Sequence, residues 1–327
     1  MHLHPLIQDA AKVLDGESLG KDEAVRLALE IDGADILDLV SLANKVRQRF
    51  APEMFACSII NAKSGVCSQN CRFCAQSGRH HTGISTYALL DKAEILSAAG
   101  AVYAEGVRSF GIVTSGRGYR EADAEFNAVL DIVDALRNEL PELGICASLG
   151  ILSEHTAKLL ADHGVRRYNM NLQTCPQRYA ELISDTHSIE EKIQTIKYLQ
   201  RYGMAICCGG IFGLGESWSD RVDMAVAIRE LDVDGIPLNV LLPIKGTPLE
   251  NMPIMDPADV AKAFAIFRLV NPAKMIKFAA GRETIMKDFQ GLLMLSGINS
   301  MITGGYLTTR GRSIAEDREL ISRLRRF

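Results

Sequence analysis

The cysteines Cys67, Cys71 and Cys74 lie within eight residues of sequence, in a C-x3-C-x2-C pattern. Cysteine thiolate is a soft ligand that selects zinc, copper(I) or iron–sulfur clusters. Three thiolates on a short loop can hold three irons of a four-iron cluster and leave the fourth iron open for chemistry. A closed structural zinc site is the alternative, but it needs a fourth ligand, usually from a second Cys or His pair. No such pair follows, although His80 and His81 lie close enough to be considered.

Four further cysteines fall in segments that we expect to be strands: Cys57, Cys146, Cys207 and Cys208. A buried cysteine is commonly just a small hydrophobic residue. Three different strands that each carry cysteine toward one interior are harder to explain by packing, and they predict a second cluster. Successive strand residues face opposite sides, so Cys207 and Cys208 cannot both point inward from a regular strand. Either the chain bulges before Gly209 or only one of the two is a ligand. Cys175 lies in an expected loop and is the weakest candidate.

Alternating strands and helices must position these thiols. The expected strands cover residues 55–60, 108–114, 143–148, 167–172, 204–208, 236–242, 275–279 and 300–303. Strands that alternate with helices at this length indicate parallel βα units, and eight of them predict a (β/α)8 TIM-type barrel. A doubly wound open sheet is the alternative, but no G-x-G-x-x-G motif opens a helix after the first strand. We expect an N-terminal helical extension that caps the barrel over residues 1–50, the barrel over 51–310 and a C-terminal helical tail over 311–327.

Composition is that of an ordinary globular α/β protein. The chain has 327 residues, 47% of them hydrophobic and 23% charged, and a formal net charge of −4. That charge gives no electrostatic case for nucleic acid, and no apolar run is long enough to span a membrane. The first residues lack the features of a signal peptide, so we expect a cytoplasmic protein. Thiols stay reduced there, which favours ligand or core roles over disulfides for the eight cysteines.

A glycine-rich segment, Gly209–Glu216, fits the pattern G-x-I-x-G-x-x-E after the expected strand 204–208. Alone it need mean only a turn, since glycine permits close backbone approach. Together with the cysteine loop it resembles the radical S-adenosylmethionine (SAM) enzymes, and over nearly the whole length the chain resembles the biotin synthase family. The further supporting segments are residues 168–174, 237–240, 243–248, 280–283, 297–300 and 307–309.

The resemblance implies a reaction and its cofactors. It implies a 4Fe-4S cluster on Cys67, Cys71 and Cys74 whose open iron binds SAM, and an auxiliary iron–sulfur cluster as the source of sulfur. One-electron cleavage of SAM would give a 5′-deoxyadenosyl radical that abstracts hydrogen from dethiobiotin, and two rounds would close the thiophane ring. The resemblance also implies a homodimer and an electron donor such as flavodoxin or ferredoxin.

Further site residues follow from the same resemblance, position by position. Phe73, Ile211 and Glu216 would contact the nucleotide of SAM. Asn171 and Asn239 would hydrogen-bond the ureido ring or the SAM ribose, and Thr308 and Thr309 would lie near the dethiobiotin carboxylate. Lys192 stands where the family often has arginine for the SAM carboxylate, and Gln173 replaces a frequent acidic residue at the ribose. Without the resemblance, ordinary strand-end polarity would explain the two asparagines and the two threonines.

The auxiliary cluster is where the chain departs from the family pattern of three cysteines and one arginine. Cys146 and Cys207 are kept, but Gly111 and Lys277 stand at the other two positions. Our hypothesis is a rearranged cluster, either 2Fe-2S or a four-iron variant, held by Cys57, Cys146, Cys207 and Cys208. Lys277 is a doubtful ligand because an ammonium has no lone pair to donate. The alternatives are another radical SAM reaction, of the hydrogenase maturase or methylornithine synthase kind, and a zinc-stabilised binding protein without catalysis.

Overall fold

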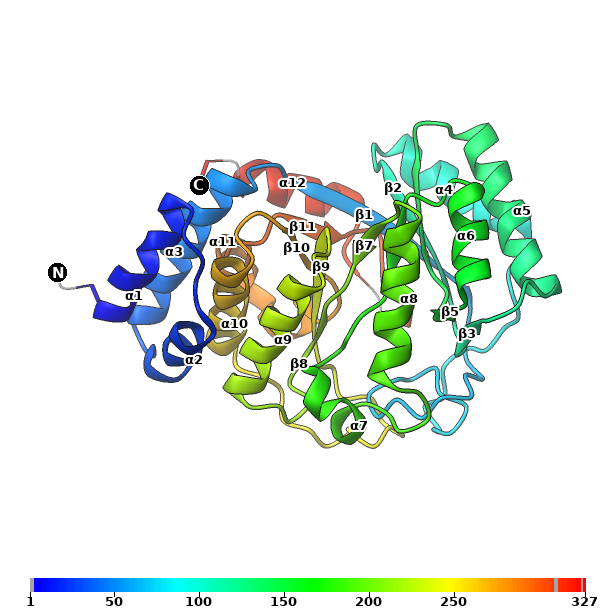
Figure 1. The fold of residues 1–327 in the computed structure, drawn as a ribbon. Coiled ribbons are helices and arrows are strands. Elements are labelled where there is room, and N and C mark those ends of the chain that lie inside the picture. Colours follow the sequence, from blue (N-terminus) through cyan, green and yellow to red (C-terminus); the bar gives the residue numbers. More distant parts are fainter. Residues whose placement is uncertain (1–2, 309–310, 325) are drawn as a thin grey trace.

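The computed structural model describes residues 3–308, 311–324 and 326–327. Within these residues the main sheet has nine strands, all parallel, and it closes on itself because β9 pairs with β10. Around the barrel the order is β1, β2, β4, β6, β7 with β8, β9, β10 and β11, so β7 and β8 share one of eight positions (Figure 1). The predicted (β/α)8 barrel is therefore confirmed. The barrel strands are β1 (Phe55–Lys63), β2 (Ser109–Thr114), β4 (Gly144–Ser148), β6 (Arg167–Asn169), β7 (Ala205–Cys207), β8 (Gly210–Phe212), β9 (Gly235–Val240), β10 (Met275–Phe278) and β11 (Ser300–Ile302).

Helices follow most of the strands and cover the outside of the barrel (Figure 1). They begin where side-chain caps are available: Asp123, Ser153, Ser188, Ser217 and Asp256 each accept a hydrogen bond from a backbone N–H of the first turn. These outer helices are α4 (Lys92–Ala104), α5 (Ala124–Glu139), α6 (Glu154–Asp162), α7 (Tyr179–Leu182), α8 (Ile189–Arg201), α9 (Trp218–Glu230), α10 (Pro257–Val270) and α11 (Gln290–Leu295). A short parallel pair, β3 (Gly118–Tyr119) with β5 (Ile151–Leu152), lies outside the main sheet.

Three helices precede the first strand: α1 (Pro5–Ala10), α2 (Lys21–Glu30) and α3 (Asp35–Phe50). They form one end of the molecule, beside α10 (Figure 1). The inward face of α3 buries Ile36, Leu39, Ala43 and Val46 at helical spacing. The partner helix α10 is buried over most of its length, which explains its nearly continuous apolar sequence.

At the other end of the chain, helix α12 (Ile314–Leu324) is joined to the barrel by a buried ion pair. Arg282 lies in a π-helical turn (Arg282–Met286) after β10, and its guanidinium is 2.9 Å from the Asp317 carboxylate. Both side chains are almost fully buried. No helix in the part of the chain that the structure describes is long and apolar enough to cross a membrane.

The fifth barrel strand is interrupted around Gly209, where the sequence left a bulge as one of two possibilities. Strand β7 ends at Cys207 and β8 resumes at Gly210. Between them the backbone of Gly209 passes so close to β9 that a Cβ atom there would lie 1.8 Å from the Pro237 carbonyl oxygen. Only glycine fits at this distance. The expected strand 167–172 is also shorter and ends at Asn169, because the chain leaves strand geometry before Gln173, where φ is 75°.

Candidate active site

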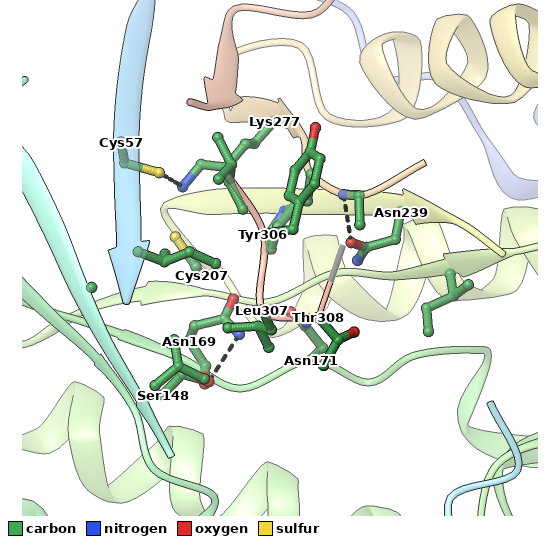
Figure 2. Close-up of a pocket in the computed structure, with 18 of the residues that line it drawn as sticks. Cys57, Ser148, Asn169, Asn171, Cys207, Asn239, Lys277, Tyr306, Leu307 and Thr308 are labelled. Atoms are coloured by element: carbon green, nitrogen blue, oxygen red, sulfur yellow. Dashed lines mark hydrogen bonds between the residues drawn. The ribbon is translucent and has the colours of Figure 1, made fainter. Parts of the chain in front are cut away.

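A cavity of about 310 Å³ opens inside the barrel at the carboxyl ends of the strands. Its wall combines strand residues, part of the cysteine loop and the segment 306–308 that follows β11 (Figure 2). The carboxyl ends of barrel strands are where barrel enzymes place their active sites, so this cavity is the candidate site.

The cysteine loop follows β1 and is held by its own backbone hydrogen bonds and by bonds to the segment around Ile183, whose carbonyl accepts from the Arg72 N–H at 2.9 Å. Cys67 N–H donates to the Gln76 carbonyl at 3.0 Å, and Cys74 N–H donates to the Cys71 carbonyl at 3.0 Å. Phe73 and Cys74 form part of the cavity wall. Burial raises the pKa of the Cys74 thiol to about 12 and also raises the pKa of Cys71. A thiol in such surroundings becomes a thiolate only when a bound cation offsets the cost of burying its charge.

Behind Cys71 lies a group that our sequence analysis missed. His187 Nε2 is 4.0 Å from the Cys71 sulfur and 2.7 Å from the Tyr179 hydroxyl. Burial and the nearby Lys192 ammonium lower the pKa of His187 to about 4, so the imidazole is neutral at pH 7. No sequence motif indicated His187, because its approach to Cys71 depends on the tertiary position of the segment between α7 and α8.

Lys192, predicted to face the SAM carboxylate, is buried on α8. Its ammonium donates a hydrogen bond to the Asn171 carbonyl at 3.0 Å and lies 5.2 Å from the centre of the Tyr179 ring. Burial lowers the pKa of Lys192 below its ordinary value. Lys192 is not part of the cavity wall, so the structure places it beneath the Asn171 backbone.

The strand thiols divide into a set that reaches the cavity and one that does not. Cys57, Cys146 and Cys207 all line it, from β1, β4 and β7. Cys208, the fourth predicted ligand, is fully buried outside the cavity wall, where its N–H donates to the Gly235 carbonyl at 2.8 Å. Of the two possibilities for Cys207 and Cys208, the structure thus has only one of them facing the cavity. Cys175 is also buried away from it, with its sulfur 3.5 Å from an Asp220 oxygen.

Lys277 lines the same cavity as the three thiols, and Figure 2 shows its ammonium beside Cys57. Its ammonium donates a hydrogen bond to the Cys57 sulfur at 3.0 Å. Burial alone would lower the pKa of Lys277, but the attraction of Cys57, Cys207 and Cys146 outweighs it and raises the pKa above its ordinary value. On the opposite side the Ser109 hydroxyl lies 3.3 Å from the Cys146 sulfur, and burial raises the pKa of Cys146 to about 11.

The predicted amide side chains line the same cavity but are partly held by the backbone. Asn171 Oδ1 accepts from the Gly209 N–H at 3.1 Å. Asn239 accepts from the Ala280 N–H at 2.9 Å and donates to the Gly210 carbonyl at 3.1 Å. Both therefore have fixed orientations and keep some hydrogen-bonding capacity for a ligand.

Three predicted SAM-binding residues have different surroundings. Ile211 and Gln173 line the cavity, and Gln173 Oε1 is buried with no hydrogen-bond partner within the described residues. Glu216 does not line it. Its carboxylate instead accepts from the N–H groups of Gly213 and Leu214, at 2.8 and 2.7 Å, and pairs with Arg221. Glu216 thus fixes the glycine turn.

The segment after β11 forms one side of the cavity. Tyr306, Leu307 and Thr308 contribute to the wall, whereas Thr309 lies outside the described residues. The Leu307 carbonyl accepts from Asn61 Nδ2 at 3.2 Å, and the Tyr306 hydroxyl donates to Glu283 at 3.2 Å. These bonds tie the segment to β1 and to the turn that carries Arg282.

Sequence reasoning missed several further polar side chains of the wall, among them Ser148, Arg167 and Asn169. Asn169 Nδ2 donates to the Ser148 hydroxyl at 3.4 Å (Figure 2). Alternation along a strand was the available signal, since Arg167, Asn169 and Asn171 are spaced by two and so share a face.

Comparison with known proteins agrees with this geometry. The profile of the Radical SAM superfamily matches residues 62–228, and that of the Biotin and Thiamin Synthesis associated domain matches residues 237–325. The chain is 54% identical to biotin synthase of Pelodictyon phaeoclathratiforme and 55% identical to biotin synthase of Chlorobium phaeovibrioides. Each match covers 99% of this chain and 98% of the relative.

Among solved structures, methylornithine synthase superposes with a TM-score of 0.83 at 20% identity, covering 96% of this chain and 95% of that one. The FeFe-hydrogenase maturase of Carboxydothermus hydrogenoformans gives a TM-score of 0.81 at 18% identity, over 97% and 78% of the two chains. At these identities the likeness shows a shared fold only. The full-length matches above 50% identity decide the family: the chain belongs to the biotin synthase family of radical SAM enzymes.

Proposed function

We propose that this protein inserts sulfur into dethiobiotin to form biotin, using SAM bound to a 4Fe-4S cluster. One observation carries the proposal: a cysteine of the loop, Cys74, and the strand cysteines Cys57, Cys146 and Cys207 line one cavity. An enzyme that generates a radical at one cluster and takes sulfur from another needs both beside the same substrate. The cavity also has an apolar wall with a few oriented amides, as expected of a small-molecule site.

The loop residues fit a 4Fe-4S cluster with an open iron. Cys67, Cys71 and Cys74 provide three soft donors on a loop that backbone hydrogen bonds hold in place. The raised pKa values of Cys71 and Cys74 mean that iron binding must drive their deprotonation. Phe73, Ile211, Gln173 and Asn171 would contact SAM, and Lys192 and Glu216 would act indirectly by holding Asn171 and the glycine turn.

The strand residues fit an auxiliary iron–sulfur cluster held by Cys57, Cys146 and Cys207. Each thiol comes from a different strand, and all three line the same cavity. Lys277 would serve as a hydrogen-bond donor to cluster sulfur and not as a ligand, since an ammonium has no free lone pair. Cys208 faces elsewhere and is left out of this proposed set.

Substrate binding would use Asn239, Thr308 and the remaining capacity of Asn171. Amides held in place by the backbone favour a ureido ring that can hydrogen-bond to them over analogues that lack those hydrogen-bonding groups. Tyr306 and Leu307 would close one side of the cavity and keep water from the reacting carbon. When bound, SAM with the loop cluster supplies radical activation of an unreactive C–H bond, and the auxiliary cluster supplies sulfur. An electron donor such as flavodoxin or ferredoxin, a homodimer and a cytoplasmic location complete the proposal.

An anaerobic single-turnover assay tests this function. The protein is reconstituted with iron and sulfide, then mixed with SAM, a reductant and dethiobiotin. We expect 5′-deoxyadenosine, methionine and biotin, with loss of auxiliary-cluster absorbance. Deoxyadenosine without biotin would contradict sulfur insertion and favour another radical SAM reaction. A protein that binds zinc in place of iron would contradict both.

A further inference from the structure

Arg167 is a cavity residue to which neither the motifs nor the proposed function assigns a role. It opens β6 and pairs in register with Cys146 on β4 and with Ala205 on β7, two residues before Cys207. Neighbouring residues in a parallel register point to the same face of the sheet. Arg167 and Cys146 both line the cavity, so the guanidinium comes from the strand next to the Cys146 thiol.

The Arg167 guanidinium has no hydrogen-bond or ion-pair partner among the described residues, and its Nε is buried. Two fully buried arginines of the described chain, Arg268 and Arg282, do have partners for their guanidinium groups. Arg268 donates to the carbonyls of Gly297, Pro272 and Lys274 and to Asn299, at 2.7 to 2.9 Å. Arg282 pairs with Asp317.

The Arg167 side chain lines a cavity with a largely apolar wall, and its guanidinium donors are satisfied by no group of the described chain. Arg268 and Arg282 show that this fold supplies partners where an arginine is purely structural. We therefore expect the Arg167 guanidinium to bind an anionic group that is not part of the chain and that occupies the cavity.

Charge indicates which anion that is. The three cavity thiols become thiolates when they hold iron, and Lys277 offsets them only from β10, where it contacts Cys57. Lys277 also attracts Cys146 and Cys207 but donates its hydrogen bond to Cys57, and Arg167, the other cation of the described wall, stands on the strand between those of Cys146 and Cys207. A guanidinium carries five donors in a rigid fork, which suits hydrogen bonding to more than one sulfur.

We propose that Arg167 donates hydrogen bonds to the sulfur atoms of the auxiliary cluster on its Cys146 and Cys207 side, opposite Lys277, and so raises the reduction potential of that cluster. The inference rests on the proposed function, because it requires the auxiliary cluster. Hydrogen bonds to sulfur and local net charge are the main protein contributions to iron–sulfur potentials. Arg167 is then a positioning residue for the sulfur donor.

The experiment isolates the auxiliary cluster. In a Cys67→Ala/Cys71→Ala/Cys74→Ala background only that cluster remains, and its midpoint potential is measured by anaerobic redox titration followed by EPR. The added variants are Arg167→Gln, Arg167→Lys and the matched control Arg166→Gln. Arg166 is the exposed preceding residue, so its loss changes net charge equally without touching the cavity.

We expect Arg167→Gln to shift the ratio of reduced to oxidised cluster about tenfold toward oxidised at a fixed poise, which is about 59 mV for a one-electron couple. Arg167→Lys should shift it less and Arg166→Gln not at all. If Arg167→Gln binds no cluster, the potential of Arg167→Lys decides.

Equal potentials in the Arg167 and Arg166 variants would overturn the inference. So would an unchanged potential with weakened dethiobiotin binding, which would assign the guanidinium to the substrate carboxylate. Absence of iron and sulfide from the triple-alanine protein itself would instead disprove the auxiliary site. This measurement is made before any Arg167 variant is prepared, so the two failures are distinguishable.

Discussion

Cys67, Cys71 and Cys74 come together within one loop, whereas Cys57, Cys146 and Cys207 come from three strands far apart in the sequence. The loop set is brought together by the chain itself, with local backbone hydrogen bonds such as Cys74 N–H to the Cys71 carbonyl and one distant anchor, Arg72 N–H to the Ile183 carbonyl. The strand set depends on barrel closure, because the three thiols face one cavity only when their strands are paired into the closed sheet. The comparison shows two ways of building a three-thiol site beside one cavity. A local site should tolerate changes in the barrel better than a site assembled by the barrel itself.

The largest expected effect separates the two sets by function. Cys71→Ala should abolish SAM cleavage and remove about four irons per chain, since the loop cluster loses one of its three thiolates. Auxiliary-cluster signals should persist because no strand residue has changed. Iron and sulfide quantitation with Mössbauer spectroscopy measures this. Cys175→Ala, the same substitution at a buried loop thiol outside the cavity, is the control and should keep full iron content.

Next comes the strand set. Cys57→Ala should remove auxiliary iron and biotin formation while deoxyadenosine formation continues, because the radical source is intact. Cys208→Ala is the matched control: this thiol is fully buried outside the cavity, so the variant should retain the auxiliary cluster. A Cys208→Ala protein that loses auxiliary iron, beside a Cys57→Ala protein that keeps it, would reverse our assignment of the strand ligands.

A weakened barrel should distinguish the sets by stability. Asp317→Ala leaves the buried Arg282 guanidinium without its main partner and should lower the free energy of unfolding by about 3 kcal/mol. We expect auxiliary iron to be lost at lower urea concentration than loop iron, as followed by absorbance under anaerobic conditions. The control is Lys158→Ala, which breaks an exposed pair with Asp162 and should leave the transition unmoved. Simultaneous loss of both clusters in the Asp317 variant would remove the distinction between local and barrel-built sites.

The smallest effect concerns the segment that borders both sets. Thr308→Val should raise KM for dethiobiotin about fivefold with little change in kcat, since one hydrogen bond contributes about 1 kcal/mol. Thr303→Val is the control, because Thr303 is buried outside the cavity wall and its hydroxyl has no partner within the described residues. A fall in kcat with unchanged KM would argue that Thr308 does not contact the substrate.

Much of the barrel was predictable because strand and helix periodicities are local. The expected segments 55–60, 275–279 and 300–303 overlap β1, β10 and β11. The sequence left open whether the chain bulges before Gly209, so it did not decide the break between β7 and β8. The break arises from the approach of Gly209 to the Pro237 carbonyl, a contact between segments distant in sequence.

The sequence by itself determined the loop thiols, their spacing and the βα alternation, since each depends on residues close together in the chain. Tertiary structure alone decided that Cys207 faces the cavity and Cys208 does not, because strand register and the break at Gly209 set those directions. It also decided that Lys277 contacts Cys57, that His187 approaches Cys71 and that Arg167 has no partner among the described residues. Side chains on separate strands meet only when the barrel closes, and local sequence patterns do not predict which of them come into contact.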